Sequence, residues 1–153
     1  FAINQIAIAG FVPIWSAFAS ANEKNDSTWK KKTFLKIEKT FLIVLGVLFV
    51  VFIGGDLIYE IWLGNQIFSY SYHLGALFSI LSLMIVINTG YAYILNGLDK
   101  LRFQIILNCL FISLILLMNL LGYFKSFLNI LIVLITGYAL VNIFYRRKIK
   151  INI

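Results

Sequence analysis

Residues 103–124 are FQIILNCLFISLILLMNLLGYF, and residues 126–145 are SFLNILIVLITGYALVNIFY. Neither run contains Lys, Arg, Asp or Glu, and the single residue between them is Lys125. An α-helix rises about 1.5 Å per residue, so roughly 20 apolar residues cross a hydrocarbon layer about 30 Å thick. Each run therefore predicts one membrane-spanning helix.

Three earlier stretches fit the same template, namely residues 1–21, 40–59 and 73–95, and Asp56 is their only charged residue. None of the five runs shows the sustained alternation of polar and apolar residues that marks a barrel strand. In hydrocarbon a helix satisfies its own backbone hydrogen bonds. The sequence therefore predicts an all-α integral membrane protein, with a single transmembrane domain over residues 1–153 and a bundle of five transmembrane helices.

The composition supports this class and excludes others. The chain is 61% hydrophobic and 12% charged, whereas soluble domains average roughly 45–50% and about 25%. Such a chain has too few polar side chains for an ordinary soluble globule, and too much hydrophobicity for disorder. One cysteine and one histidine (Cys109 and His73) exclude an internal disulfide and predict no Cys/His metal site and no bound cofactor.

The beginning of the chain has no signal-peptide pattern, because Phe1 lies inside an apolar run with no basic segment before it. We therefore expect the sequence to be a fragment of a longer protein.

The positive charge lies on one side of the predicted bundle. If the helices alternate in direction, twelve of the thirteen Lys and Arg residues fall in the connections 22–39 and 96–102 and in the tail after residue 145. Only Lys125 falls on the other side, and the connection 60–72 has no Lys or Arg. Cytoplasmic loops of membrane proteins carry such an excess. We therefore expect a multi-pass inner-membrane protein with a cytoplasmic C-terminus, and no nucleic-acid binding despite the net charge of +7.

The connection before the second run has an amphipathic pattern over residues 27–41. Its large apolar residues share one helical face, and they are Trp29, Phe34, Ile37 and Phe41. We expect a short helix on the cytoplasmic surface of the membrane, with Asp26 or Ser27 as its N-cap. The alternative is a solvated charged loop. In either case the lysines are expected to contact anionic lipid headgroups.

No catalytic motif is found in the sequence, which contains no phosphate-binding glycine loop, no CxxC and no HExxH. Asp56 and Glu60 are one helical turn apart and share a face, so they are candidates for binding a proton or a cation. The simpler interpretation places both in the water of the headgroup layer. His73 is likewise interpreted as an interface residue.

Uncharged polar residues inside the runs are more informative. They are Asn4, Gln5, Ser16, Asn88, Thr89, Asn108, Asn119 and Asn142. Because an amide facing lipid tails is costly, such residues face other helices or a watery cavity. Hydrogen bonding between helices is the commoner explanation, and lining of a solute pathway is the alternative. The first run also contains Pro13, which removes a backbone donor and favours a bend.

Three short blocks carry a resemblance to a known family. They are PIWSAF at 13–18 followed by WKK at 29–31, YEIWLG at 59–64, and NGLDK at 96–100 with Gln104 just after. In order and spacing these blocks are similar to those of the oligosaccharide flippases, the Wzx-type O-antigen transporters. That family belongs to the multidrug/oligosaccharidyl-lipid/polysaccharide (MOP) exporter superfamily. The last run is the part that departs from the family pattern, because the connection 122–126 is terse.

The resemblance implies that the five runs are most of the second six-helix half of a MOP-type transporter. The N-terminal bundle would then be missing from this sequence and would be a partner of these helices. The implied function is not enzymatic. It is the flipping of an undecaprenyl-diphosphate-linked oligosaccharide, an O-antigen or capsule repeat unit, across the inner membrane by alternating access. The partners would be this lipid-linked oligosaccharide, membrane lipids, and H⁺ or Na⁺ as the coupling ion.

Under this interpretation five residues are candidates for lining the substrate cavity, and they are Asn4, Gln5, Trp15, Asn88 and Tyr91. The cations that a diphosphate requires would come from the missing half, since no Lys or Arg lies deep in a run. Three rival functions are a MATE-like small-molecule efflux transporter, a membrane polysaccharide polymerase or ligase, and a non-transporting scaffold. Efflux of cations favours acids buried in a span, and polymerases favour a large charged outer loop.

Overall fold

The computed structural model describes residues 2–63 and 71–153, and every regular element in these two ranges is an α-helix. The helices are α1 (Ala2–Glu23), α2 (Ser27–Ile53), α3 (Gly55–Leu63), α4 (Tyr72–Gly97), α5 (Leu101–Leu120) and α6 (Phe127–Asn152). The prediction of an all-helical protein is thus confirmed for the described residues. Most of the predicted outer connection 60–72 lies outside them.

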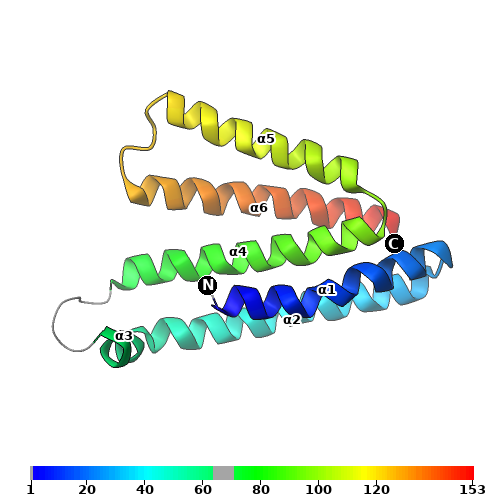
Figure 1. The fold of residues 1–153 in the computed structure, drawn as a ribbon, viewed down its shortest axis with the longest axis horizontal. Coiled ribbons are helices and arrows are strands. Elements are labelled where there is room, and N and C mark those ends of the chain that lie inside the picture. Colours follow the sequence, from blue (N-terminus) through cyan, green and yellow to red (C-terminus); the bar gives the residue numbers. More distant parts are fainter. Residues whose placement is uncertain (1, 64–70) are drawn as a thin grey trace.

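The five long helices lie side by side in an elongated bundle, and α3 lies across the end of α2 (Figure 1). Helix α4 is central, because it packs against α1, α2, α5 and α6. Helix α5 lies at the edge, beside α6 (Figure 1). The α1–α2 turn, the α4–α5 turn and the C-terminus all lie at one end of the bundle, and the α5–α6 turn lies at the other. The segments that carry most of the Lys and Arg residues therefore share one end.

Within residues 2–63 and 71–153, three helices are long and apolar enough to cross a membrane, and they are α4, α5 and α6. The chain is therefore a membrane protein by the length and composition of its helices. Helix α2 differs because charged residues from Lys36 to Lys39 interrupt it, which leaves residues 40–53 as its apolar part. At about 1.5 Å per residue this part is roughly 21 Å long, short of a hydrocarbon layer of about 30 Å.

The predicted run 40–59 is not one straight helix. Helix α2 ends at Ile53, Gly54 forms a turn, and α3 begins at Gly55. The Gly54 amide donates to the carbonyl oxygen of Val50 at 2.9 Å, which still continues the α2 pattern, so the break comes directly after it. The local signal for this break is the glycine pair Gly54 and Gly55 followed by Asp56, rather than the overall hydropathy of the run.

Residues 27–41 form a helix as predicted, and the Asp26 side chain caps it by accepting a hydrogen bond from the Trp29 amide at 2.9 Å. The prediction of a separate surface helix is wrong, since this segment continues without a break into the rest of α2. Its apolar face is buried in protein. Phe34 and Phe41 both pack on the ring of Tyr91 in α4, with centroid distances of 6.0 and 5.4 Å.

Three helices end in the same kind of turn. Asn25, Asp99 and Gly122 follow α1, α4 and α5 with φ angles of 52°, 57° and 69°. In each case the amide of this residue donates to the carbonyl oxygen three residues before it. The amide of the following residue donates to the carbonyl oxygen five residues before it, which completes the Schellman arrangement. Such a turn reverses the chain within a few residues. It also ends α5 at Leu120, before the predicted boundary at residue 124.

The core of the bundle is aromatic, and α1 lies unusually close to α4 within it. Phe18 is fully buried, and Phe11 stacks edge-on against Phe41 with a centroid distance of 5.8 Å. A methyl group on Gly97 of α4 would lie 2.5 Å from Cβ of Phe18 and 2.7 Å from the carbonyl oxygen of Trp15. Only glycine permits this approach, so Gly97 fixes the contact between the two helices.

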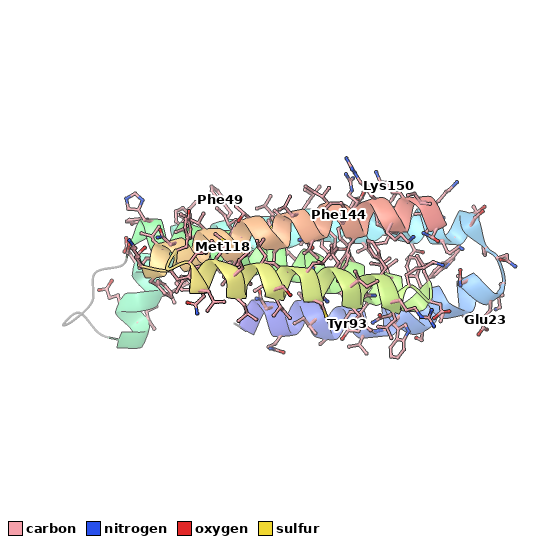
Figure 2. All side chains as sticks on the ribbon, turned by 90° about the horizontal axis from the view of Figure 1, so that it is seen from above. Glu23, Phe49, Tyr93, Met118, Phe144 and Lys150 are labelled. Carbon is pink, nitrogen blue, oxygen red and sulfur yellow. The ribbon has the colours of Figure 1, made fainter. Side chains whose placement is uncertain are left out.

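The outside of the bundle is largely aliphatic. Gln104 is the only buried residue of α5, and the exposed fractions of Ile106 and Leu110 are 61% and 62%. Side chains radiate outward along the whole bundle, with Glu23 and Lys150 near the end that carries the C-terminus (Figure 2). Exposing such a surface to water costs about 25 cal/mol per Å², so hydrocarbon is its natural surrounding.

Candidate functional site

A groove of about 610 Å³ runs between α2, α4 and α6. Its polar lining consists of Glu38, Lys39, Tyr91, Asn142 and Arg146, and the rest of its wall is apolar. We call it the α2–α4–α6 groove. It is the described region in which charged, amide and hydroxyl side chains of three helices meet beside open space, and it is therefore the candidate site.

Glu38 is the centre of the charged end of the groove. Its carboxylate accepts hydrogen bonds from Nε and Nη2 of Arg146 at 2.5 and 3.2 Å, and from the Tyr91 hydroxyl at 3.3 Å. Partial burial raises the pKa of Glu38, but the hydrogen bonds and positive charge of Arg146, with the Tyr91 hydrogen bond, outweigh this effect. The net result is a pKa below the ordinary value, so Glu38 is ionised at neutral pH.

Asn142 lies deeper in the groove and ties α6 to α4. Its Nδ2 donates to the Met84 carbonyl oxygen at 3.0 Å, and its Oδ1 accepts from Nδ2 of Asn88 at 3.2 Å. At the edge of the bundle the Tyr145 hydroxyl donates to Oδ1 of Asn108 at 3.1 Å. These amides thus hydrogen-bond between helices, which is the commoner of the two interpretations drawn from the sequence.

The five candidate cavity residues do not gather in one place. Tyr91 lines the groove, and Asn88 reaches it through its bond to Asn142. Asn4, Gln5 and Trp15 lie on α1, outside the groove lining. The exposed fraction of Trp15 is 52%, and Oδ1 of Asn4 is buried with no hydrogen-bond partner in the described part of the chain.

The block at residues 96–100 holds helices together. Nε2 of the buried Gln104 donates to Oδ1 of Asn96 at 2.8 Å and to the Ala92 carbonyl oxygen at 3.0 Å, which joins α5 to α4. Gly97 provides the close approach to α1, and Asp99 has the positive φ of the turn. Asn96, Gly97 and Asp99 of this block therefore each have a structural role in the fold.

Lys30 departs from the expectation that the lysines contact lipid headgroups. Only 6% of it is exposed, and its Nζ donates to Oδ1 of Asn22 at 3.3 Å and to the Asn152 carbonyl oxygen at 3.5 Å. A cation at the last carbonyls of a helix is favoured by the helix dipole. Lys30 thereby fastens the start of α2 to the end of α6, whereas Lys31 and Lys32 are exposed.

The acids at the opposite end do not form a metal site. The Tyr72 hydroxyl donates a hydrogen bond to Asp56, and Glu60 is exposed. Among the described residues, no group of three or more His, Cys, Asp and Glu side chains is placed to hold a metal ion.

Comparison of the chain with protein-family models, with curated proteins and with solved structures finds no match. The functional argument therefore rests on the residues themselves.

Proposed function

We propose that this chain is most of one helical bundle of a transporter that moves a lipid-linked oligosaccharide across the bacterial inner membrane by alternating access. The resemblance of its three sequence blocks to the oligosaccharide flippases supports the substrate class. Three spanning helices, packed with α1 and α2 around α4, support a membrane bundle. In this proposal α1 and α2 also cross the membrane, which gives five transmembrane helices. The short apolar part of α2 is accommodated by local thinning of the bilayer and by lysine side chains that extend to the headgroups.

One observation carries the proposal, namely the difference between two outer faces of the bundle. The exposed face of α5 is dominated by bulky Ile and Leu, with Asn108, Ser113 and Asn119 among them. Among its described side chains, the exposed face of α1 has only two large aliphatic residues, Ile6 and Val12, and its other exposed residues include Gln5, Trp15 and the small residues Ala9, Gly10, Ser16 and Ser20. Bulky Ile and Leu side chains suit lipid tails, whereas small residues let a second bundle approach closely and leave room for a cavity beside them. The face of α5 is therefore assigned to lipid and the face of α1 to a cavity.

A cavity along α1 suits a sugar headgroup. Hydroxyl-rich ligands require hydrogen-bonding groups and a flat aromatic surface, and Gln5 and Trp15 supply one of each. Pro13 lies between them and leaves the Ala9 carbonyl without its helical hydrogen bond. A helix weakened at its midpoint is able to change its bend as access alternates between the two sides of the membrane.

Orientation follows from the basic end of the bundle. The α1–α2 and α4–α5 turns and the C-terminus share this end (Figure 1). Because their segments carry most of the Lys and Arg residues, the positive-inside rule assigns this end to the cytoplasm. The oligosaccharide then enters from the basic end and leaves at the end that carries the α5–α6 turn.

Cation efflux is the less supported alternative. A cation-coupled drug exporter needs an acid that is free to bind its cargo. Glu38 is already paired with Arg146, and Asp56 accepts a hydrogen bond from Tyr72. Both of these acids are thus engaged within the protein.

The test is a deletion strain with no redundant transporter, complemented by variants of the full-length gene. We expect deletion to abolish surface glycan and to accumulate its lipid-linked precursor. A Gln5→Leu/Trp15→Ala variant is expected to complement poorly, whereas Leu110→Ala on the lipid face of α5 should complement fully. Normal surface glycan without accumulation in the deletion strain would contradict the proposal.

A further inference from the structure

The α2–α4–α6 groove changes from charged to apolar along the axis of the bundle. Helix α2 runs away from the basic end and α6 runs toward it (Figure 1). Glu38, Lys39 and Arg146 therefore lie nearer the basic end, while Leu42 and Ala139 lie one to two helical turns deeper, about 6–10 Å. This order matches the order of headgroup and acyl chain across one leaflet.

The charged end of the groove has an excess of positive charge. Lys39 and Arg146 line it together with a single acid, Glu38. A guanidinium has five N–H donors, and the pair with Glu38 uses two of them. Lys39 is exposed and forms no ion pair with the described residues. The groove therefore offers an anion both a free ammonium and unused guanidinium donors.

The size of the groove favours a slender occupant over a helix. A helix about 10 Å wide, rising about 1.5 Å per residue, occupies roughly 120 Å³ per residue. The groove of about 610 Å³ thus equals roughly five residues of helix, far fewer than a membrane span. One extended acyl chain needs much less width, and the apolar wall that includes Leu42, Ile87 and Ile143 suits it.

We propose that the α2–α4–α6 groove binds one anionic membrane phospholipid. Its phosphate contacts Lys39 and the outer N–H groups of Arg146, and one acyl chain follows Leu42 and Ile143 toward the membrane centre. The bound lipid fills the open side of the contact between α2 and α6. This site is separate from the α1 face assigned to the oligosaccharide, so its existence does not depend on the proposed transport function.

Photolabelling in nanodiscs tests the site. The purified chain is reconstituted with phosphatidylglycerol that carries a diazirine in one acyl chain, and labelled residues are located by mass spectrometry. We expect labelling at Leu42 and Ile143 to exceed that at Ile112 on the exposed face of α5. The diazirine derivative of phosphatidylcholine, which is zwitterionic, should show no such preference.

Two matched lysine variants complete the design. Lys39→Ala is expected to lower groove labelling by about fivefold, the effect of removing one lysine beside an anionic headgroup. Lys36→Ala removes an exposed lysine of the same helix that does not line the groove, so it should leave the labelling unchanged. Tryptophan fluorescence of each variant confirms that the fold is retained.

Three results would overturn the proposal. Equal groove labelling by both lipids, or no response to Lys39→Ala, would make the groove an ordinary lipid-facing surface. Protection of the groove from both lipids would show that protein covers it. Complete displacement of phosphatidylglycerol by an equimolar polyprenyl phosphate would make the groove a carrier site instead.

Discussion

Glu38 and Arg146 are 108 residues apart in the chain, and their side chains form a two-point ion pair that joins α2 to α6. The Tyr91 hydroxyl of α4 donates to the same carboxylate, so three helices meet at one acid. Because this acid joins three helices, its charge state contributes to the stability of this end of the bundle.

Acid should weaken the bundle through Glu38. The pKa of this carboxyl is lowered from its ordinary value of 4.5 in the folded protein, so the unfolded chain binds more protons as the pH falls. The stabilisation is complete above about pH 4.5 and is lost as the pH falls through the lower folded-state pKa. Since the side chain of Arg146 is 49% exposed, we expect the ion pair to contribute only about 0.5–1 kcal/mol to the free energy of unfolding.

The measurement is the melting temperature of the wild type and of Glu38→Gln in detergent, taken from neutral pH down through the acid range in which Glu38 becomes protonated. The wild type should be the more stable protein at neutral pH, and the difference should vanish in acid. Glu23→Gln, at an exposed residue of the α1 terminus, serves as the control. A difference that is unchanged between neutral and acid pH would show that the ion pair does not stabilise the fold.

Two glycine substitutions should have opposite outcomes. Gly97→Ala places a methyl group against the backbone of α1 and forces the two helices apart, so we expect a loss of about 1–3 kcal/mol. The methyl group of Gly46→Ala on α2 would lie in open space, with no atom of a neighbouring helix within 4 Å. This substitution should be neutral or stabilising by up to about 1 kcal/mol. Denaturant unfolding in mixed micelles measures both, and equal effects would contradict the close contact of α1 with α4.

The bond between Asn88 and Asn142 should appear as a coupling energy. We expect a double-mutant cycle of Asn88→Ala and Asn142→Ala to give about 0.6 kcal/mol, with an upper bound of roughly 1.7 kcal/mol, as for other hydrogen bonds between membrane helices. Ser113 is an exposed residue on α5, so a cycle of Asn88→Ala with Ser113→Ala should give no coupling energy. Additive effects of the two asparagine variants would indicate that their bond contributes nothing to stability.

Local sequence signals predicted much of the fold. Runs without charge mark the long helices, because few other structures satisfy the backbone in hydrocarbon. The Asp26 cap and the shared face of Phe34, Ile37 and Phe41 were also predicted, since both depend on residues within a few positions of one another. What that face packs against was not predicted, because the partner residue Tyr91 lies on another helix.

The candidate site could not be predicted as a unit. Glu38 looks like a solvated acid among lysines, and its partner Arg146 looks like one cation of a basic tail. Only tertiary packing brings them together. The burial of Lys30 at the end of α6 has the same origin, whereas the break after Gly54 has a local signal in the glycine pair Gly54 and Gly55.

Cysteine accessibility in intact cells tests the central claim most directly, namely that the helices cross the inner membrane with their basic end in the cytoplasm. In a Cys109→Ser background, Lys31→Cys lies at the basic end and Lys125→Cys lies at the α5–α6 turn. A membrane-impermeant maleimide should label position 125 from outside and position 31 only after the membrane is opened. Labelling of position 31 from outside, with position 125 protected, would contradict the account.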